Sequence, residues 1–205
     1  MASQITHIPY ARKIKNLFLS DQLIEDNKYY LGTLFPDIRY LGNLKREETH
    51  DLEPTIDKLV QMRGSFNKGS YVHSLVDVER EKTLKKLGIY NYVEENGINV
   101  SVIKFVEDEF SYGLIHDWSK YVKYLDEIVT DETTLVSVDI VKKWHILLKK
   151  YFSEPPTIQT IVAFSQNLHN FDADTIERAK NAYQKIKSNR KALSIIQETY
   201  IRIFN

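Results

Sequence analysis

Apolar residues recur at intervals of three and four along most of this chain, and this spacing constrains its fold more than any other feature. Near the N-terminus, for example, Tyr10, Ile14, Leu17 and Phe18 follow one another at such intervals. Residues spaced in this way meet on one face of an α-helix. Alternating patterns typical of strands are short and few. We therefore expect an all-α fold, built as a compact multi-helix domain.

Further helices are predicted over 68–87, 98–115, 117–129 and 136–152. Gly88 stands where a glycine commonly ends a helix, and Pro155-Pro156 breaks the helical pattern. Two more amphipathic segments follow, the first around Ile176–Ile186 and the second around Leu193–Ile203. Either Asp172 or Asp174 would cap the first of them.

The length of 205 residues suits one sizeable domain with a substantial core. The trailing segments are too few to build a core of their own. We expect a single helical domain over 1–205, with the chemically interesting residues in 1–117 and the C-terminal helices of 157–205 packing on that part.

Charge and composition exclude several classes of protein. The formal net charge is zero, so no global field favours nucleic acid. The chain has no cysteine, which excludes disulfides and cysteine-based zinc motifs. It has no secretory signal pattern and no apolar stretch long enough to span a bilayer. We expect a cytoplasmic protein without a transmembrane segment; its oligomeric state stays open.

The segment 31–52 differs from its surroundings. Gly32, Pro36 and Gly42 interrupt a mixed polar sequence, which favours an extended or irregular connection over a helix. Loops of this length inside a compact domain are uncommon and are usually functional. This segment contains Asp37 and His50.

Histidine and aspartate residues are strung through the first half of the chain: His7, Asp37, His50, His73 and Asp77. His73 and Asp77 are four residues apart on a predicted helix, so both project from one face. Imidazole and carboxylate are the ligands that transition metals take where thiolate is absent. If these side chains converge, they form a metal site.

The order of these motifs resembles the zinc-dependent phospholipase C family, whose fold is shared with single-strand-specific zinc nucleases. That family has a histidine near the N-terminus, then an aspartate, a second histidine some fourteen residues later, and His-x-x-x-Asp on a helix. Here Asp37 precedes His50 by thirteen residues, and Gly32-x-x-x-Pro36-Asp37-Ile38 also looks like the family's segment. The resemblance covers about residues 5 to 80.

The resemblance implies an all-α fold and roles for individual residues. Asp37, His50, His73 and Asp77 would hold one metal ion, and Asp77 would bridge to a second ion that His7 also binds. Asp37 would double as the catalytic group that orients or deprotonates the attacking water. The implied cofactor is Zn²⁺, with Mn²⁺ or another divalent transition metal as the alternative, and two ions.

The chain departs from the family pattern in two places. The secreted enzymes begin with a tryptophan whose amino group ligates metal, whereas this sequence begins with Met1. They also use a later histidine and a His-x-x-x-Glu helix for a further ion, and no such motif occurs here. The nearest substitutes are Glu107, Asp108, His116 and Asp117, which either supply a further ligand or belong to a solvated helix face.

His145 and His169 have no acidic partner at metal-ligand spacing, and we expect both to be structural. The chain also contains no phosphate-cradling glycine loop, nucleophile elbow or nucleotide-binding fingerprint.

The sequence favours a hydrolase: a metal-dependent phosphoesterase that uses metal-activated water on a phosphodiester or phosphomonoester. Its substrate would be a small phosphate ester or a phospholipid head group. Two alternatives stay open. An HD-type phosphohydrolase would use the doublets His50-Asp51 and His116-Asp117. A non-catalytic helical protein would bind a metal, or merely form a His/Asp hydrogen-bond cluster, for structural reasons.

Overall fold

The computed structural model describes residues 2–169 and 172–204, and it is all-helical, without strands, over those ranges. The expected fold class is therefore confirmed. The α-helices are α1 (Gln4–Phe18), α2 (Asp26–Leu34), α3 (Arg39–Gly42), α4 (Ile56–Gln61), α5 (Ser65–Lys86), α6 (Ile89–Glu95), α7 (Ile103–Tyr112), α8 (Ser119–Tyr124), α9 (Val138–Phe152), α10 (Ile158–Leu168), α11 (Ala173–Ser188) and α12 (Arg190–Arg202). Short 3₁₀ helices, named η1 (Phe35–Ile38), η2 (Arg46–Glu48), η3 (Val100–Val102) and η4 (Thr130–Thr133), join some of them.

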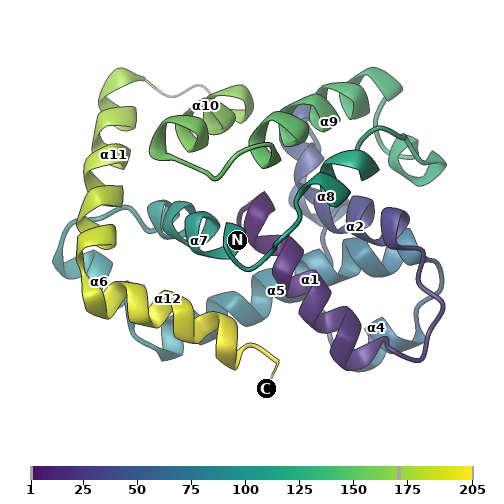
Figure 1. Cartoon of the computed structure of the whole chain (residues 1–205), viewed down its shortest axis with the longest axis horizontal. Helices are drawn as coiled ribbons and strands as arrows, with labels where there is room; N and C mark the ends of the chain where they lie inside the picture. The colour runs from purple at the N-terminus through teal and green to yellow at the C-terminus, as the bar shows by residue number, and fades with distance from the viewer. Residues whose placement is uncertain (1, 170–171, 205) are drawn as a thin grey trace.

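Helices α1 and α5 cross near the middle of the molecule, with α9 and α10 along one edge and α11 and α12 along another (Figure 1). Helix α1 contacts α2, α5 and α7. Buried apolar residues from these elements form a continuous core cluster. The C-terminal helices join the rest of the molecule where α11 contacts α7 and α12 contacts α5. The first half of the chain thus surrounds α1.

The closest helix contact brings α2 against α5 through two glycines. A Cβ atom on Gly69 would lie 1.9 Å from the carbonyl oxygen of Tyr29, and one on Gly32 would lie 2.1 Å from that of Phe66. Both distances are far below van der Waals contact. Only glycine at both positions allows the two backbones to approach so closely.

The segment 31–52 is more helical than its composition suggests, so the prediction of a long irregular connection is wrong for much of it. Its first residues complete α2, and η1, α3 and η2 follow in close succession. Gly32 is tolerated inside α2 because its missing side chain permits the contact with α5. Pro36 lies in the first turn of η1, where its missing N–H costs nothing.

The other helix predictions hold with shifted ends. The helix predicted over 117–129 shortens to α8, and the one over 98–115 divides into η3 and α7. The sequence pattern does not predict α10 as a separate helix. Asp172 rather than Asp174 caps α11, accepting a hydrogen bond from the backbone N of Thr175 at 2.7 Å. Within the described ranges, no helix is both long and apolar enough to cross a membrane.

Candidate metal centre

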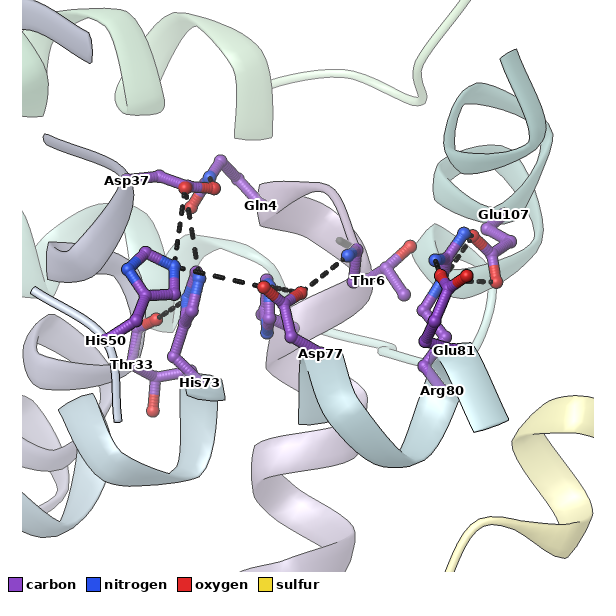
Figure 2. Close-up of polar contacts among 12 residues, drawn as sticks. Gln4, Thr6, Thr33, Asp37, His50, His73, Asp77, Arg80, Glu81 and Glu107 are labelled. Carbon is purple, nitrogen blue, oxygen red and sulfur yellow. Dashed lines mark hydrogen bonds and ion pairs between the residues drawn. The ribbon is translucent and has the colours of Figure 1, made fainter. Parts of the chain in front are cut away.

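Helix α5 presents His73 and Asp77 from one face, one turn apart, as the sequence predicts. Both side chains are buried: His73 is 0% exposed and Asp77 is 3% exposed. His7 comes from the first half of α1 and Asp37 from η1, while His50 follows η2. Segments far apart in the sequence therefore meet at one buried point between α1, η1 and α5 (Figure 2).

Two groups of these side chains could each hold a metal ion. The first is His7, His73 and Asp77, and the second is Asp37, His50 and His73. In each group the possible ligand atoms all lie within 4.8 Å of one another, and every member is buried. These two groups are the candidates found in the described residues, and His73 belongs to both.

The separations between ligand atoms are those of a slightly expanded coordination sphere. Asp37 Oδ1 lies 4.0 Å from His50 Nε2 and 3.9 Å from His73 Nε2. Asp77 reaches both groups, with Oδ2 3.8 Å from His50 Nε2 and Oδ1 3.6 Å from His7 Nε2. A tetrahedral zinc site with bonds of about 2.0–2.1 Å separates its ligands by about 3.4 Å. Movements of a few tenths of an ångström would close the difference.

Several ligand atoms lack the hydrogen bond that buried polar atoms normally make. Among the described residues these include both ring nitrogens of His7, Asp37 Oδ1, and the Nε2 atoms of His50 and His73. A buried polar atom without a partner costs free energy, on the order of 1–3 kcal/mol. Here such atoms gather around one point and face one another. A bound cation would satisfy Asp37 Oδ1 and one nitrogen of each ring, so the residues present fit a metal ion.

Hydrogen bonds fix which nitrogen of two rings is available. His73 Nδ1 lies 2.9 Å from the carbonyl oxygen of Thr33. Because a carbonyl only accepts, Nδ1 carries the proton and Nε2 keeps its lone pair. His50 Nδ1 is similarly occupied by Thr49 Oγ1 at 2.8 Å. A single Nε2 atom on His73 serves one ion at a time, so the two groups compete for that residue.

Electrostatics favour the protonation states that metal ligands require. Burial, followed by the effect of His73, holds the pKa of His7 well below its usual value. Burial, again aided by His73 and then by Arg46, lowers the pKa of His50 to about 3. Burial alone would raise the pKa of Asp77, but His73 and His7 hold it well below its usual value. At neutral pH, His7 and His50 are neutral and Asp77 is ionised.

The rings of His7 and His73 stack with centroids 3.7 Å apart and planes 14° from parallel. His50 meets His73 nearly edge-on, with centroids 4.9 Å apart. Packing therefore restrains the three rings before any ligand is present, which is the preorganisation that a binding site needs.

Residues beyond the predicted set hold the carboxylates in place. Gln4 Nε2 donates to Asp37 Oδ2 at 2.5 Å. The backbone N of Ala2 donates to Asp77 Oδ1 at 2.8 Å, and Arg46 Nη2 donates to Asp77 Oδ2 at 2.9 Å. No motif in the sequence points to Ala2 or Arg46. The only signal for Gln4 is its position three residues before His7, which places both on one helix face.

The candidate further ligands on and after α7 do not join the two groups. Glu107 is buried in a two-oxygen ion pair with Arg80, whose Nε lies 2.8 Å from Oε2 and 3.0 Å from Oε1. Asp108 is buried and accepts hydrogen bonds from the Thr6 backbone N, the Thr6 hydroxyl and the Tyr151 hydroxyl. Burial raises the pKa of Asp108 to about 6, against the effect of these bonds. Both acids tie α7 to its neighbours.

His116 and Asp117 are exposed, and Asp117 accepts from the backbone N of Ser119 at 2.9 Å. Asp51 is also occupied elsewhere, in an ion pair with Lys58. The doublets expected of an HD-type phosphohydrolase therefore contribute His50 alone to the candidate groups.

The two C-terminal histidines have different surroundings. Both ring nitrogens of His145 are bonded, Nδ1 to the carbonyl oxygen of Leu125 at 3.1 Å and Nε2 to Glu132 at 2.7 Å. This is the structural role expected for it. His169 instead lies edge-on to Tyr40, with ring centroids 4.7 Å apart, in the wall of a cleft that reaches Asp37.

That cleft is narrow, with a volume of about 30 Å³, and Asp37 is the candidate ligand that lines it. A larger cavity of about 620 Å³ lies between η3, α7 and α11 and contains none of the candidate ligands. The small cleft matters more for chemistry because it connects the buried carboxylate with the outside.

The chain has no significant match among protein-family models, curated proteins or solved structures. The geometry of the site therefore carries the functional argument.

Proposed function

We propose that this protein is a metal-dependent phosphoesterase, which hydrolyses a phosphomonoester or phosphodiester with water. The observation that carries the proposal is the convergence of unpartnered imidazole and carboxylate atoms from α1, η1 and α5. The cleft over Asp37 supports it, because a purely structural metal site needs no access for a substrate.

Asp37, His50, His73 and Asp77 would hold the tighter ion, because His73 offers Nε2 on the side of Asp37. His7 and Asp77 would hold a second ion with fewer ligands, and hence more weakly. Nitrogen and carboxylate donors without thiolate suit Zn²⁺, with Mn²⁺ as the alternative. Ions held there would supply Lewis-acid polarisation of the phosphoryl oxygens and lower the pKa of a bound water.

Asp37 is the residue to which we assign the acid–base role. It is the candidate ligand that lines the cleft, so it meets a water entering from outside. Gln4 holds its Oδ2 atom and thereby orients the whole carboxylate. In this position Asp37 would orient the attacking water and accept its proton, a contribution typically worth about 10²–10⁴ in rate. These roles match those implied by the resemblance to the zinc-dependent phospholipase C family.

A non-catalytic metal protein is the second candidate, because the side chains of His7, His50 and His73 are 0% exposed. Burial of this kind also suits a site that only holds the fold together. The two candidates differ in turnover, so activity measured beside metal content distinguishes them.

The test measures bound metal by elemental analysis together with hydrolysis of chromogenic phosphomonoesters and phosphodiesters. We expect activity that chelation removes and Zn²⁺ or Mn²⁺ restores. Asp77→Asn and His73→Ala should lose metal, whereas Asp37→Asn should lose at least about 10² in rate. His116→Ala, at an exposed position, is the matched control. Bound metal with no hydrolysis of any ester would favour the structural role, and the absence of metal would refute both candidates.

A further inference from the structure

Lys104 stands out among the lysines because it is partly buried and makes no hydrogen bond or ion pair with any described residue. Other lysines removed from solvent donate to defined partners. Lys15 pairs with Asp26, and the buried Lys68 donates to the carbonyl oxygen of Leu59 at 3.0 Å. The centre of the Phe105 ring lies 5.5 Å from the Nζ atom of Lys104, but among the described residues this ammonium group lacks the hydrogen-bond or ion-pair partner that such groups normally have.

The position of Lys104 links it to the candidate metal centre. It lies in the first turn of α7 and lines the same narrow cleft as Asp37, Gln4, Tyr40 and His169. Burial lowers its pKa, while the negative charges of Asp37 and Asp108 act in the opposite direction. The ammonium is therefore poorly solvated and close enough to Asp37 to interact with it.

Lys104 lines the cleft, and two arginines lie near it. After burial, the charges of Lys104 and Arg39 are the next causes that lower the pKa of His169. Arg46 forms an ion pair with Asp77, and Arg39 lies near Asp37. Lys104, by contrast, makes no ion pair with a described residue, although Asp37 and Asp108 both act on its charge. An ammonium group without an ion-pair partner attracts anions, and it attracts doubly charged ones most strongly.

We propose that Lys104 forms an anion subsite beside Asp37 that binds the non-ester oxygens of a terminal phosphate group and so selects phosphomonoesters over diesters. The cleft is narrow: about 30 Å³ holds about two water molecules, which is room for non-ester oxygens and not for a bulky organic group. A diester would have to lead an organic group out on each side of its phosphorus. A monoester needs one exit, and the cleft shares Phe105 and Ser165 with the larger cavity on one side.

This inference rests on the proposed function, and its test uses binding rather than turnover. Inorganic phosphate and dimethyl phosphate are titrated calorimetrically into zinc-loaded protein at about pH 8, above the second pKa of a phosphate monoester near 6. At that pH the first probe carries two charges and the second carries one. Lys104→Gln removes the ammonium, Lys104→Arg keeps a positive charge, and the exposed Lys143→Gln is the matched control.

We expect Lys104→Gln to weaken phosphate binding at least about tenfold, the size of a lost charge-assisted hydrogen bond. The affinity for dimethyl phosphate should fall distinctly less in Lys104→Gln. The Lys104→Arg variant should keep most of the affinity for phosphate. Zinc content should be the same in all variants, which separates an effect on the anion from an effect on the metal or on folding.

Unchanged phosphate affinity in Lys104→Gln, or equal losses for both anions, would overturn the anion subsite and leave the proposed function standing. If the wild-type protein takes up no zinc, the proposed function fails by itself. The subsite is then judged by the same variants in metal-free protein, where the absence of phosphate binding, or of any effect of Lys104→Gln, would overturn it.

Discussion

At the scale of single residues, the candidate centre depends on side chains that orient the ligands as well as on the ligands themselves. The carbonyl of Thr33 fixes the tautomer of His73, and Gln4 occupies one oxygen of Asp37. Loss of a partner of this kind typically lowers metal affinity by about 10–100-fold. The orientation of Asp37 therefore deserves a direct test.

Replacing Gln4 with alanine should weaken zinc binding by about 10–100-fold without abolishing it. The reason is that Asp37 loses the donor that turns its Oδ1 atom toward His50 and His73. A competition titration against a zinc-binding dye measures the change. Gln22→Ala is the control, since Gln22 is partly exposed and donates to the carbonyl oxygen of Val60 instead. Equal affinities in Gln4→Ala and wild type would show that Asp37 needs no such support.

The sequence was sufficient to name the side chains that converge, because His73 and Asp77 share one face of α5 and His7, Asp37 and His50 lie beside them. It could not reveal Gln4, Arg46 or Lys104. Their roles depend on side chains meeting from α1, η2 and α7, and no local spacing records that meeting. The same reason explains Glu107, whose partner Arg80 lies 27 residues away.

At the scale of helices, the pair α2 and α5 determines where the ligands lie. Gly32 and Gly69 let the two backbones approach so closely that a Cβ atom on either glycine would overlap the backbone of the other helix. This contact holds the carbonyl of Thr33 against His73. The position of the imidazole therefore depends on a glycine contact one turn away from it.

Gly69→Ala should lower the free energy of unfolding by about 3 kcal/mol, at the upper end of overpacking effects. Its Cβ would lie 1.9 Å from one backbone atom and 2.8 Å from another, and neither can rotate away. Urea unfolding measures the loss. Gly113→Ala should stay within about 0.5 kcal/mol of wild type, because its Cβ would have its nearest neighbour at 3.5 Å. Equal stability of the two variants would contradict the packing argument.

Helical periodicity was enough to predict the fold class and most helices, because amphipathic faces are local properties of the sequence. It failed over 31–34, where Gly32 indicates a break by its intrinsic propensity and is helical because of a tertiary contact. It also gave Leu17 a place on the apolar face of the first helix, although that side chain is 50% exposed. Which apolar residues are covered depends on the neighbouring helices.

At the scale of the whole molecule, folding of the metal-free protein buries polar groups that water reaches in the unfolded chain. Free histidine takes up a proton below about pH 6.5, whereas burial keeps His50 neutral down to about pH 3. Between these values the unfolded chain binds more protons than the folded one. The free energy of unfolding must therefore fall as the pH falls through this window.

We expect metal-free protein to lose stability between about pH 6.5 and pH 4, with His50 contributing up to about 1.4 kcal/mol per pH unit. Urea unfolding across this range measures the slope. His50→Gln should flatten it, and the exposed His116→Gln should not. Comparing variants separates His50 from other groups, such as Asp108, that titrate in the same range. A wild-type slope in His50→Gln would contradict the burial argument.

The central claim is that the converging histidines and aspartates bind a metal ion, and anomalous diffraction from crystals soaked in Zn²⁺ tests it most directly. The account predicts an ion within about 2.0–2.2 Å of ligand atoms from Asp37, His50, His73 and Asp77. A second, weaker peak is expected beside His7 and Asp77. Crystals in which these side chains bind no zinc at saturating concentration, or in which zinc lies only at surface residues, would contradict the account.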